Sequence, residues 1–315
     1  MPTIDFFRGK RVVDFDPSQS LQDNVVYRVY VEAYTDNGQV PVSEQIEALS
    51  NKDGVQYLTS LIIGNWGMDE PPDASSILPS MLEAAPKFES LTGLVWGDID
   101  SEECEISWIE NDDLGPMVQA LPKLEYLKII GGQGLDLTGL NHPVLKTLKI
   151  ESGGLSVELI RSLMRANLPK LETLSLWLGS EDYGFDAEAS DFEPLLLGTA
   201  YPDIKPLFPK LKKLALANSP IADDLAETMS QSAALFEQLN ELDMSMGTMT
   251  DRGASALAQN PHLGSLKKLD LSSNFIEDAD LLEQMRAKGV RVKDMGQKAP
   301  DHYGDEVYYY VDVAE

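Results

Sequence analysis

The sequence predicts an α/β fold, a solenoid in which short parallel strands alternate with helices along the chain. Three observations predict it. A leucine-rich frame recurs eight times between residues 58 and 276, and amphipathic helical stretches follow the later copies. At 315 residues the chain is also long for one globular core, whereas a repeat array lengthens without enlarging its core.

The frame is most complete in residues 266–276, which read LKKLDLSSNFI and match L-x-x-L-x-L-x-x-N-x-L. Because alternate side chains of a strand face opposite ways, the fourth and sixth positions point inward together. Asn274 stands where its amide can bond free backbone groups as the chain leaves the strand. This pattern is typical of a leucine-rich repeat. Its copies begin at Leu58, Leu91, Leu124, Leu145, Leu171, Leu211, Leu239 and Leu266.

The spacing of the copies predicts the kind of repeat. The last three begin 28 and 27 residues apart, and residues 221–238 and 250–260 have the pattern of helices, with Thr250 or Asp251 as an N-cap. A strand and a helix in one repeat of this length predict a horseshoe, with parallel strands on the concave face and helices on the convex face. Residues 289–295 (GVRVKDM) predict a further strand.

The two ends of the chain differ from the repeats. Residues 24–34 alternate in polarity, and with residues 11–15 they are expected to form an antiparallel N-terminal β cap, followed by a helix at 43–50. Residues 297–306 are expected to be an acidic linker. Residues 307–313 alternate like a strand, either a C-terminal cap or a peptide that pairs with a partner's sheet edge. The expected domains are a cap (1–54), a repeat array (55–296) and an acidic, Tyr-rich tail (297–315).

Charge limits the classes of partner. Asp and Glu number 52 against 25 Lys and Arg, which gives a net charge of −27. Nucleic acid and anionic membrane surfaces both require basic residues, so neither is expected as a partner. A basic protein or a cation fits the charge better, although high negative charge also serves solubility alone.

The compartment predicted is the cytoplasm. The one cysteine, Cys104, has no second cysteine with which to form an internal disulfide. The N-terminus carries charges where a signal peptide has an apolar run, and no stretch approaches about 20 apolar residues.

Several stretches depart from the generic repeat in a shared way and resemble one family. Together they resemble a bacterial cytoplasmic leucine-rich-repeat family of the ribonuclease-inhibitor-like superfamily, over roughly residues 55–290. The resemblance implies this fold and location, and it implies no reaction. The stretches are IIGNWG (62–67), WGDIDSEECEISWIE (96–110), IESGGL (150–155), LWLGSEDYG (176–184) and DMSMGTMTDRGASAL (243–257).

No arrangement of residues indicates catalysis or a cofactor. The histidines His142, His262 and His302 are far apart and have no metal-ligand spacing, and no P-loop motif occurs. The acids around Cys104 disfavour its thiolate. We therefore expect no enzyme, no catalytic residue, no metal site and no cofactor.

Two acidic segments remain without an assigned role. Residues 98–113 and 172–203 each hold eight acids and no basic residue. They are solvated loops, a site for a basic partner, or a Ca²⁺ or Mg²⁺ site, and the EF-hand spacing is absent.

A binding surface is expected on the concave sheet, where the third, fifth and seventh frame positions point outward. Trp177 stands there as a hot spot beside Tyr126 and a Lys128–Lys149 pair, or else it is buried under the loop 179–204. The predicted partner-binding patch consists of Tyr126, Lys128, Lys149, Glu151, Trp177, Glu241 and Asp243.

The function predicted is a non-catalytic protein–protein interaction scaffold that binds a basic partner on its concave face and acidic loops. One alternative is a divalent-cation-dependent enzyme or enzyme accessory that uses the acidic loops. Another is a GTPase-activator-like regulator, which rests on fold analogy alone.

Overall fold

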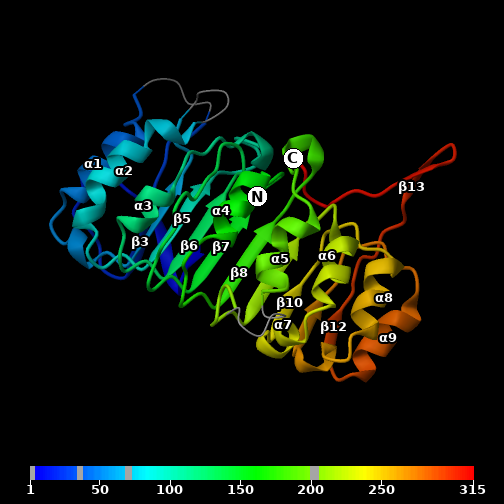
Figure 1. Cartoon of the computed structure of the whole chain (residues 1–315). Helices are drawn as coiled ribbons and strands as arrows, with labels where there is room; N and C mark the ends of the chain where they lie inside the picture. The colour runs from blue at the N-terminus through cyan, green and yellow to red at the C-terminus, as the bar shows by residue number, and fades with distance from the viewer. Residues whose placement is uncertain (1–3, 34–37, 68–72, 199–205) are drawn as a thin grey trace. The chain divides into compact units, whose positions relative to one another are not determined.

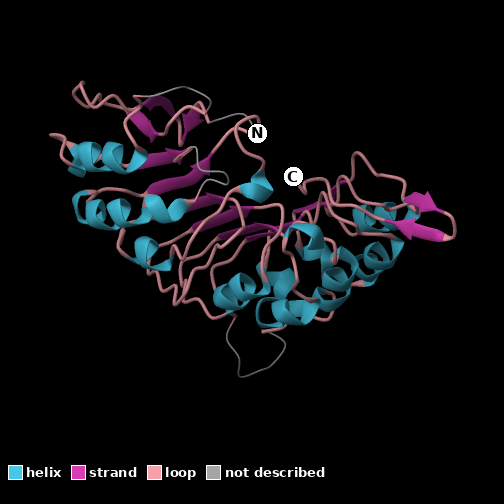
Figure 2. Ribbon diagram, turned by 90° about the horizontal axis from the view of Figure 1, so that it is seen from above, coloured by secondary structure: helices cyan, strands magenta, loops and turns pink. Residues whose placement is uncertain are grey.

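The computed structural model describes residues 4–33, 38–67, 73–198 and 206–315. They form two compact units. Unit 1 holds Met1–Glu151, Arg165–Leu168 and Glu315, and unit 2 holds Ser152–Met164 and Pro169–Ala314. Each unit is an α/β leucine-rich-repeat solenoid with strands on one side and helices on the other (Figure 2), as the frame predicts.

Unit 1 is built on strands that pair in chain order. The fourth frame positions align across the sheet, so that Leu61, Leu94, Leu127 and Leu148 are register partners in turn and are all fully buried. The strands are β1 (Phe6–Phe7), β2 (Lys10–Asp14), β3 (Val25–Val29), β4 (Ser60–Gly64), β5 (Gly93–Asp98), β6 (Tyr126–Ile130) and β7 (Thr147–Glu151). The helices are α1 (Val42–Ser50), α2 (Leu78–Ala84) and α3 (Gly115–Gln119).

The antiparallel pairing expected of residues 11–15 and 24–34 is wrong. β2 and β3 pair in parallel, with Val12 opposite Val26, and β3 continues in parallel to β4. Alternating polarity is the same in both strand directions, so it predicts a strand without predicting its direction. The antiparallel element is β1, which turns back onto β2 through Arg8 and Gly9, both at positive φ as a two-residue hairpin turn requires. Residue 34 lies outside the described residues.

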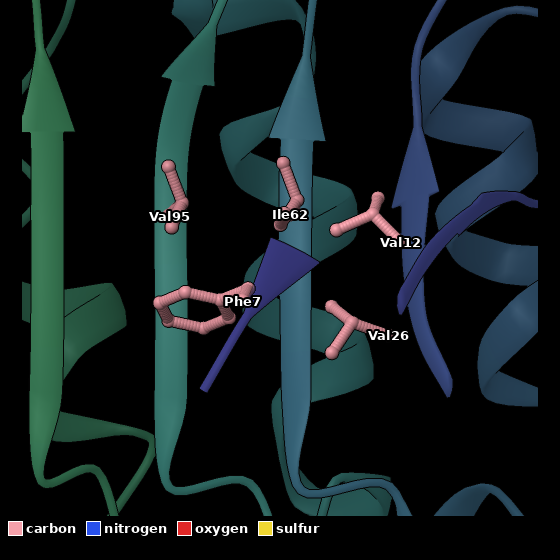
Figure 3. Close-up of a cluster of buried hydrophobic side chains, with 5 residues drawn as sticks. All are labelled: Phe7, Val12, Val26, Ile62 and Val95. Atoms are coloured by element: carbon pink, nitrogen blue, oxygen red, sulfur yellow. The ribbon is translucent and has the colours of Figure 1, made fainter. Parts of the chain in front are cut away.

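The N-terminal segment also covers part of the strand face opposite the helices, which we call the open face. Phe7 lies in front of the strands there and packs with Val12, Val26, Ile62 and Val95 (Figure 3). Ile4 and Tyr126 border the cluster. The N-terminal β cap therefore buries apolar open-face side chains of β2 to β5.

Unit 2 repeats the strand–helix alternation. β8 to β12 pair in parallel and in order, and the predicted strand at 289–295 is β12. The strands are β8 (Thr173–Trp177), β9 (Lys213–Ala217), β10 (Glu241–Asp243), β11 (Lys268–Asp270) and β12 (Arg291–Lys293). The helices are α4 (Val157–Met164), α5 (Glu193–Leu196), α6 (Ala222–Met229), α7 (Ala233–Gln238), α8 (Asp251–Gln259) and α9 (Ala279–Ala287).

The predicted helix over 221–238 is two helices, because the chain leaves α6 at Ser230 and starts again at Ser232, whose hydroxyl accepts from the Leu235 amide at 3.3 Å. Of the two predicted N-cap residues of α8, Thr250 and Asp251, Thr250 is the N-cap. The buried Asn274 amide bonds Met244 O at 2.9 Å and Leu271 O at 3.1 Å, and it accepts from Met249 N at 3.0 Å. The frame Asn thus ties its own strand to the previous repeat.

The C-terminal tail is ordered and docks on unit 2. Residues expected to be a linker include β13 (Asp301–Tyr303), which pairs antiparallel with β14 (Glu306–Tyr308) in a hairpin at the red end of the chain in Figure 1. Every hairpin residue is exposed. Beyond it, the Asp312 amide donates to Met246 O at 3.0 Å, and the Val313 amide donates to Asn218 Oδ1 at 2.9 Å. The three-domain division of the sequence stays a prediction.

Candidate functional site

The open face changes character along unit 1. At the fifth frame position β4 and β5 carry Ile62 and Val95, which Phe7 covers. β6 and β7 carry Lys128 and Lys149 at the same position, and both are partly exposed. The accessible part of this face therefore begins at β6.

Four predicted site residues lie together on β6 and β7. The Tyr126 ring meets the Phe7 ring edge to face, with 5.2 Å between centroids, which leaves it half-buried. Lys128 Nζ lies 2.8 Å from a Glu151 carboxylate oxygen, and the two side chains are only 17% and 13% exposed. Lys149 is the register partner of Lys128 and has no ion pair among the described residues. Lys149 is thus the available cation of this group.

Trp177, on β8 of unit 2, is partly exposed, as the hot-spot alternative requires. Its register partner on β9 is Ala217, and two residues earlier Ser175 pairs with Ala215. Ala217 is buried, so the exposed part of the indole does not lie over this alanine alone. Part of the loop 179–204 lies outside the described residues.

Glu241 and Asp243 on β10 are less free than their positions suggest. A Glu241 carboxylate oxygen lies 2.9 Å from Lys213 Nζ on β9. Asp243 Oδ1 accepts from the Ser245 amide at 3.0 Å and from the Ser245 hydroxyl at 2.6 Å. Asp270 makes the same two bonds to Ser272 one repeat later. Asp243 therefore holds a turn in addition to facing the open side.

The seven predicted site residues fall into two groups. Tyr126, Lys128, Lys149 and Glu151 belong to unit 1, and Trp177, Glu241 and Asp243 belong to unit 2. Each group lies at outward positions of neighbouring or near-neighbouring strands in its own unit. That they serve one partner stays a prediction.

The acidic segment 98–113 is only partly a solvated loop. Asp98 is buried, accepts from the Ile4 amide at 3.1 Å and lies 3.5 Å from Arg28, yet burial raises the pKa of its carboxyl. Asp113 accepts from the Gly115 and Thr138 amides, both at 3.0 Å. A hollow of ≈ 330 Å³ lies between Arg28, Tyr30 and acids 98–103. Much of this segment's charge thus supports local structure.

In the acidic segment 172–203 some carboxylates also support local structure and others are exposed. Asp203 lies outside the described residues. Asp186 accepts from the Val157 amide at the start of α4 at 2.6 Å, and Asp191 pairs with Arg161 at 2.9 Å. Glu181 and Asp182 are exposed and form no ion pair within the described part of the chain. They are two free carboxylates of the described part of this segment.

The side chains that could serve as a nucleophile or a metal ligand have environments that disfavour these roles. Burial and the neighbouring Glu105 and Glu103 raise the pKa of the Cys104 thiol to about 11. The buried His142 accepts from the Leu145 amide at 3.1 Å, and Nε2 donates to Leu121 O at 3.1 Å, so it is a turn residue as expected. Across the described ranges no three His, Cys, Asp or Glu residues gather as metal ligands do. Nor is any described helix long and apolar enough to span a membrane.

One surface feature, the Phe7 cover, went unnoticed in the sequence. It was detectable, because the fifth frame position is apolar in the copies at Leu58 and Leu91 and lysine in those at Leu124 and Leu145. For the tail, a C-terminal cap was one of the two alternatives expected of residues 307–313, but the contacts that hold it were not detectable in the repeat pattern. These contacts include that of Asn218 with Val313, 95 residues apart.

Comparisons with known proteins agree with the fold. Residues 239–258, which include β10 and most of α8, match the family described as "Leucine Rich repeat". A comparison with curated proteins gives no match. The structure of the TLR13–ssRNA13 complex is similar at a TM-score of 0.47 and 17% identity, over 92% of this chain and 34% of that one.

The crystal structure of a Bacteroides fragilis protein, a structural-genomics target, has a TM-score of 0.72 to this chain. The two sequences are 32% identical, and the match covers 82% of this chain and 71% of that one. With this identity over most of both chains, and with leucine-rich repeats in both of its units, the protein belongs to the same leucine-rich-repeat family as the Bacteroides fragilis protein.

Proposed function

We propose that this protein is a non-catalytic interaction scaffold that binds a basic partner protein through the open face of its strands. The observation that carries the proposal is the change of that face at β6. Before it, apolar side chains are covered by the chain's own Phe7, and from it onward aromatic and charged side chains are partly exposed. Exposed aromatic side chains beside charged ones are typical of binding hot spots.

Electrostatics supports a basic partner. The net charge of −27 attracts positively charged proteins at long range and repels nucleic acid. On the strands, Lys128 and Lys213 are each neutralised by a glutamate on the next strand, so they do not reverse this field. The exposed carboxylates Glu181 and Asp182 add to it.

We also propose the type of repeat, the bacterial origin and the cytoplasmic location of the protein. In the last repeats a strand is followed by helix, α6 and α7 in the 28-residue repeat and α8 in the 27-residue one, and this supports the ribonuclease-inhibitor-like type of leucine-rich repeat. The resemblance of residues 55–290 supports a bacterial protein of the cytoplasm. Neither the cation-dependent enzyme nor the GTPase-activator-like regulator is favoured by a specific feature of the described residues.

The test is a capture experiment on a double variant, Tyr126→Ala with Trp177→Ala, with a matched control. The control is Tyr57→Ala with Trp108→Ala, which removes one tyrosine and one tryptophan that are 75% and 56% exposed outside the predicted patch. We expect the first variant to lose the partner that the wild type and the control retain. A folded first variant that retains every partner contradicts the open-face site.

Because Tyr126 packs on Phe7, a second variant separates binding from folding. Lys149→Glu reverses the charge of a partly exposed side chain that has no ion pair in the described chain. We expect it to alter partner capture while its circular dichroism and melting temperature stay close to those of the wild type. An unchanged partner set with Lys149→Glu places the binding surface elsewhere.

A further inference from the structure

A groove of ≈ 660 Å³ lies in unit 2 where the strands end and the helices begin. One wall is the C-terminal tail, including Tyr308, Tyr309 and Tyr310. The other lining residues, which we call the second wall, come from the turn after β8, with Glu181 and Asp182, and from the first turns of α6 and α8. In open α/β sheets the carboxyl ends of parallel strands are where ligands commonly bind.

The tail wall is held in place by several contacts. The Asn218 side chain bonds both backbone groups of Val313, accepting from its amide at 2.9 Å and donating to its carbonyl. Tyr309 packs edge to face on Phe275 with 5.0 Å between centroids. Lys298 Nζ donates to Tyr310 O and to Asp312, each at 2.7 Å. The groove therefore exists before any ligand arrives, which lowers the entropic cost of binding.

Aromatic faces are exposed on this wall. Tyr308, Tyr309 and Tyr310 are 38%, 41% and 54% exposed. The rings of Tyr308 and Tyr310 are nearly parallel, at 9° and 6.4 Å between centroids. The face of such a ring attracts an ammonium or guanidinium group, more strongly when the cation is partly desolvated.

The second wall is acidic and only partly neutralised. Asp223 is buried and accepts from the Thr250 and Gly253 amides, both at 2.9 Å, so it joins α6 to α8. Arg252 is tied to Asp224 at 2.7 Å. Arg252 is the one cation lining the groove as the structure describes it, and with the unpaired Glu181 and Asp182 the wall has four carboxylates against it. The groove thus combines a surplus of negative charge with exposed tyrosine rings.

We propose that this groove binds arginine or lysine side chains from an extended basic segment of a partner protein. The cationic group lies on the tyrosine rings while its charge faces Glu181 and Asp182. The occupant follows from charge complementarity: a nucleic-acid phosphate or an acidic peptide meets uncompensated carboxylates, whereas a guanidinium satisfies both walls. The inference rests on the proposed function, since it names the chemistry of the partner and a second surface for it.

The test uses the full-length chain and two blocked synthetic peptides, one alternating arginine with glycine and one alternating glutamate with glycine. Binding is measured by titration calorimetry at low salt. We expect the arginine peptide to bind and the glutamate peptide to give no heat of binding. Glu181→Gln with Asp182→Asn is expected to weaken binding about fivefold or more, as the loss of two charge contacts implies.

A matched control separates this groove from general acidity. Glu158→Gln with Glu193→Gln removes two exposed charges from α4 and α5 of the same unit and is expected to change affinity less than about twofold. Tyr308→Leu with Tyr310→Leu leaves the charge unchanged and is expected to weaken binding about fivefold. An arginine peptide that does not bind, a control that weakens binding as much as the groove variant, or tyrosine variants without effect each overturn the proposal.

The same variants keep this inference distinct from the proposed function. If the captured partner is lost with Tyr126→Ala and Trp177→Ala but retained by all groove variants, the open face binds and the groove proposal fails. If the groove variants alone lose the arginine peptide and the partner, the groove binds and the open-face site fails.

Discussion

Single buried polar residues set the geometry of the turns between repeats, and His142 is one whose titration can be measured. Its Nδ1 accepts from the Leu145 amide, so a proton on Nδ1 meets another donor. Burial lowers the pKa of this imidazole from the ordinary 6.5. The His142 imidazole is therefore neutral in the folded protein at pH 7.

The pH dependence follows from the direction of this shift. The unfolded chain takes up the proton near pH 6.5, and the folded chain takes it up only at lower pH. The contribution of His142 to the free energy of unfolding is therefore complete above pH 6.5 and is lost as pH falls toward the folded pKa. In an NMR titration, with the signal assigned by its absence from His142→Asn, we expect a midpoint below 6.5. A midpoint at or above 6.5 contradicts the buried neutral turn.

At the scale of elements, β1 acts as a cover. Phe7 is 7% exposed and packs over Ile62 and Val95, whereas its neighbour Phe6 is 71% exposed. We expect Phe7→Ala to lower the free energy of unfolding by about 3 kcal/mol, because it removes a buried aromatic side chain and uncovers apolar strand residues. Chemical denaturation of both variants measures this. Phe6→Ala is the control, with an expected change under about 0.5 kcal/mol, and equal effects of the two substitutions refute the cover.

The docked tail gives a second prediction for an element. Asn218 lies at φ 53°, where Asn and Gly are tolerated, so Asn218→Gly keeps the backbone conformation and removes only the amide that bonds Val313. We expect faster hydrogen exchange at the amides of Asp312 and Val313. Asn24→Gly, at φ 60° in unit 1, is the matched control and leaves the tail unchanged. Unaltered exchange in Asn218→Gly means that other contacts hold the tail.

The elements of the repeat itself could be predicted from the sequence, because the same apolar positions recur in every copy. Leu269 and Leu271 were predicted to point inward together because alternate side chains of a strand share a face, and both are buried. Strand direction at residues 11–15 was not predictable from polarity, which is symmetric along the strand. A C-terminal cap was one of two alternatives predicted for the tail, but its contacts and the groove beside it were not predictable, because they depend on residues far apart in the chain. For the predicted binding patch, the outward positions could be predicted from the repeat frame, whereas the pairing of Glu241 with Lys213 and the turn made by Asp243 could not.

At the scale of the whole molecule, the excess of acids over bases is the property that the partner must complement. The net charge is −27, and its long-range field is screened within about 8 Å at physiological salt. Binding that relies on this field should therefore weaken as salt increases, whereas binding to an apolar surface should not.

Binding of a basic partner is tested most directly by affinity capture with the full-length protein at low and high salt, followed by mass spectrometry. We expect a stoichiometric basic protein that is retained at low salt, released at high salt and lost from Tyr126→Ala with Trp177→Ala. An acidic partner, a partner whose retention is independent of salt, or no partner at low salt would contradict this expectation.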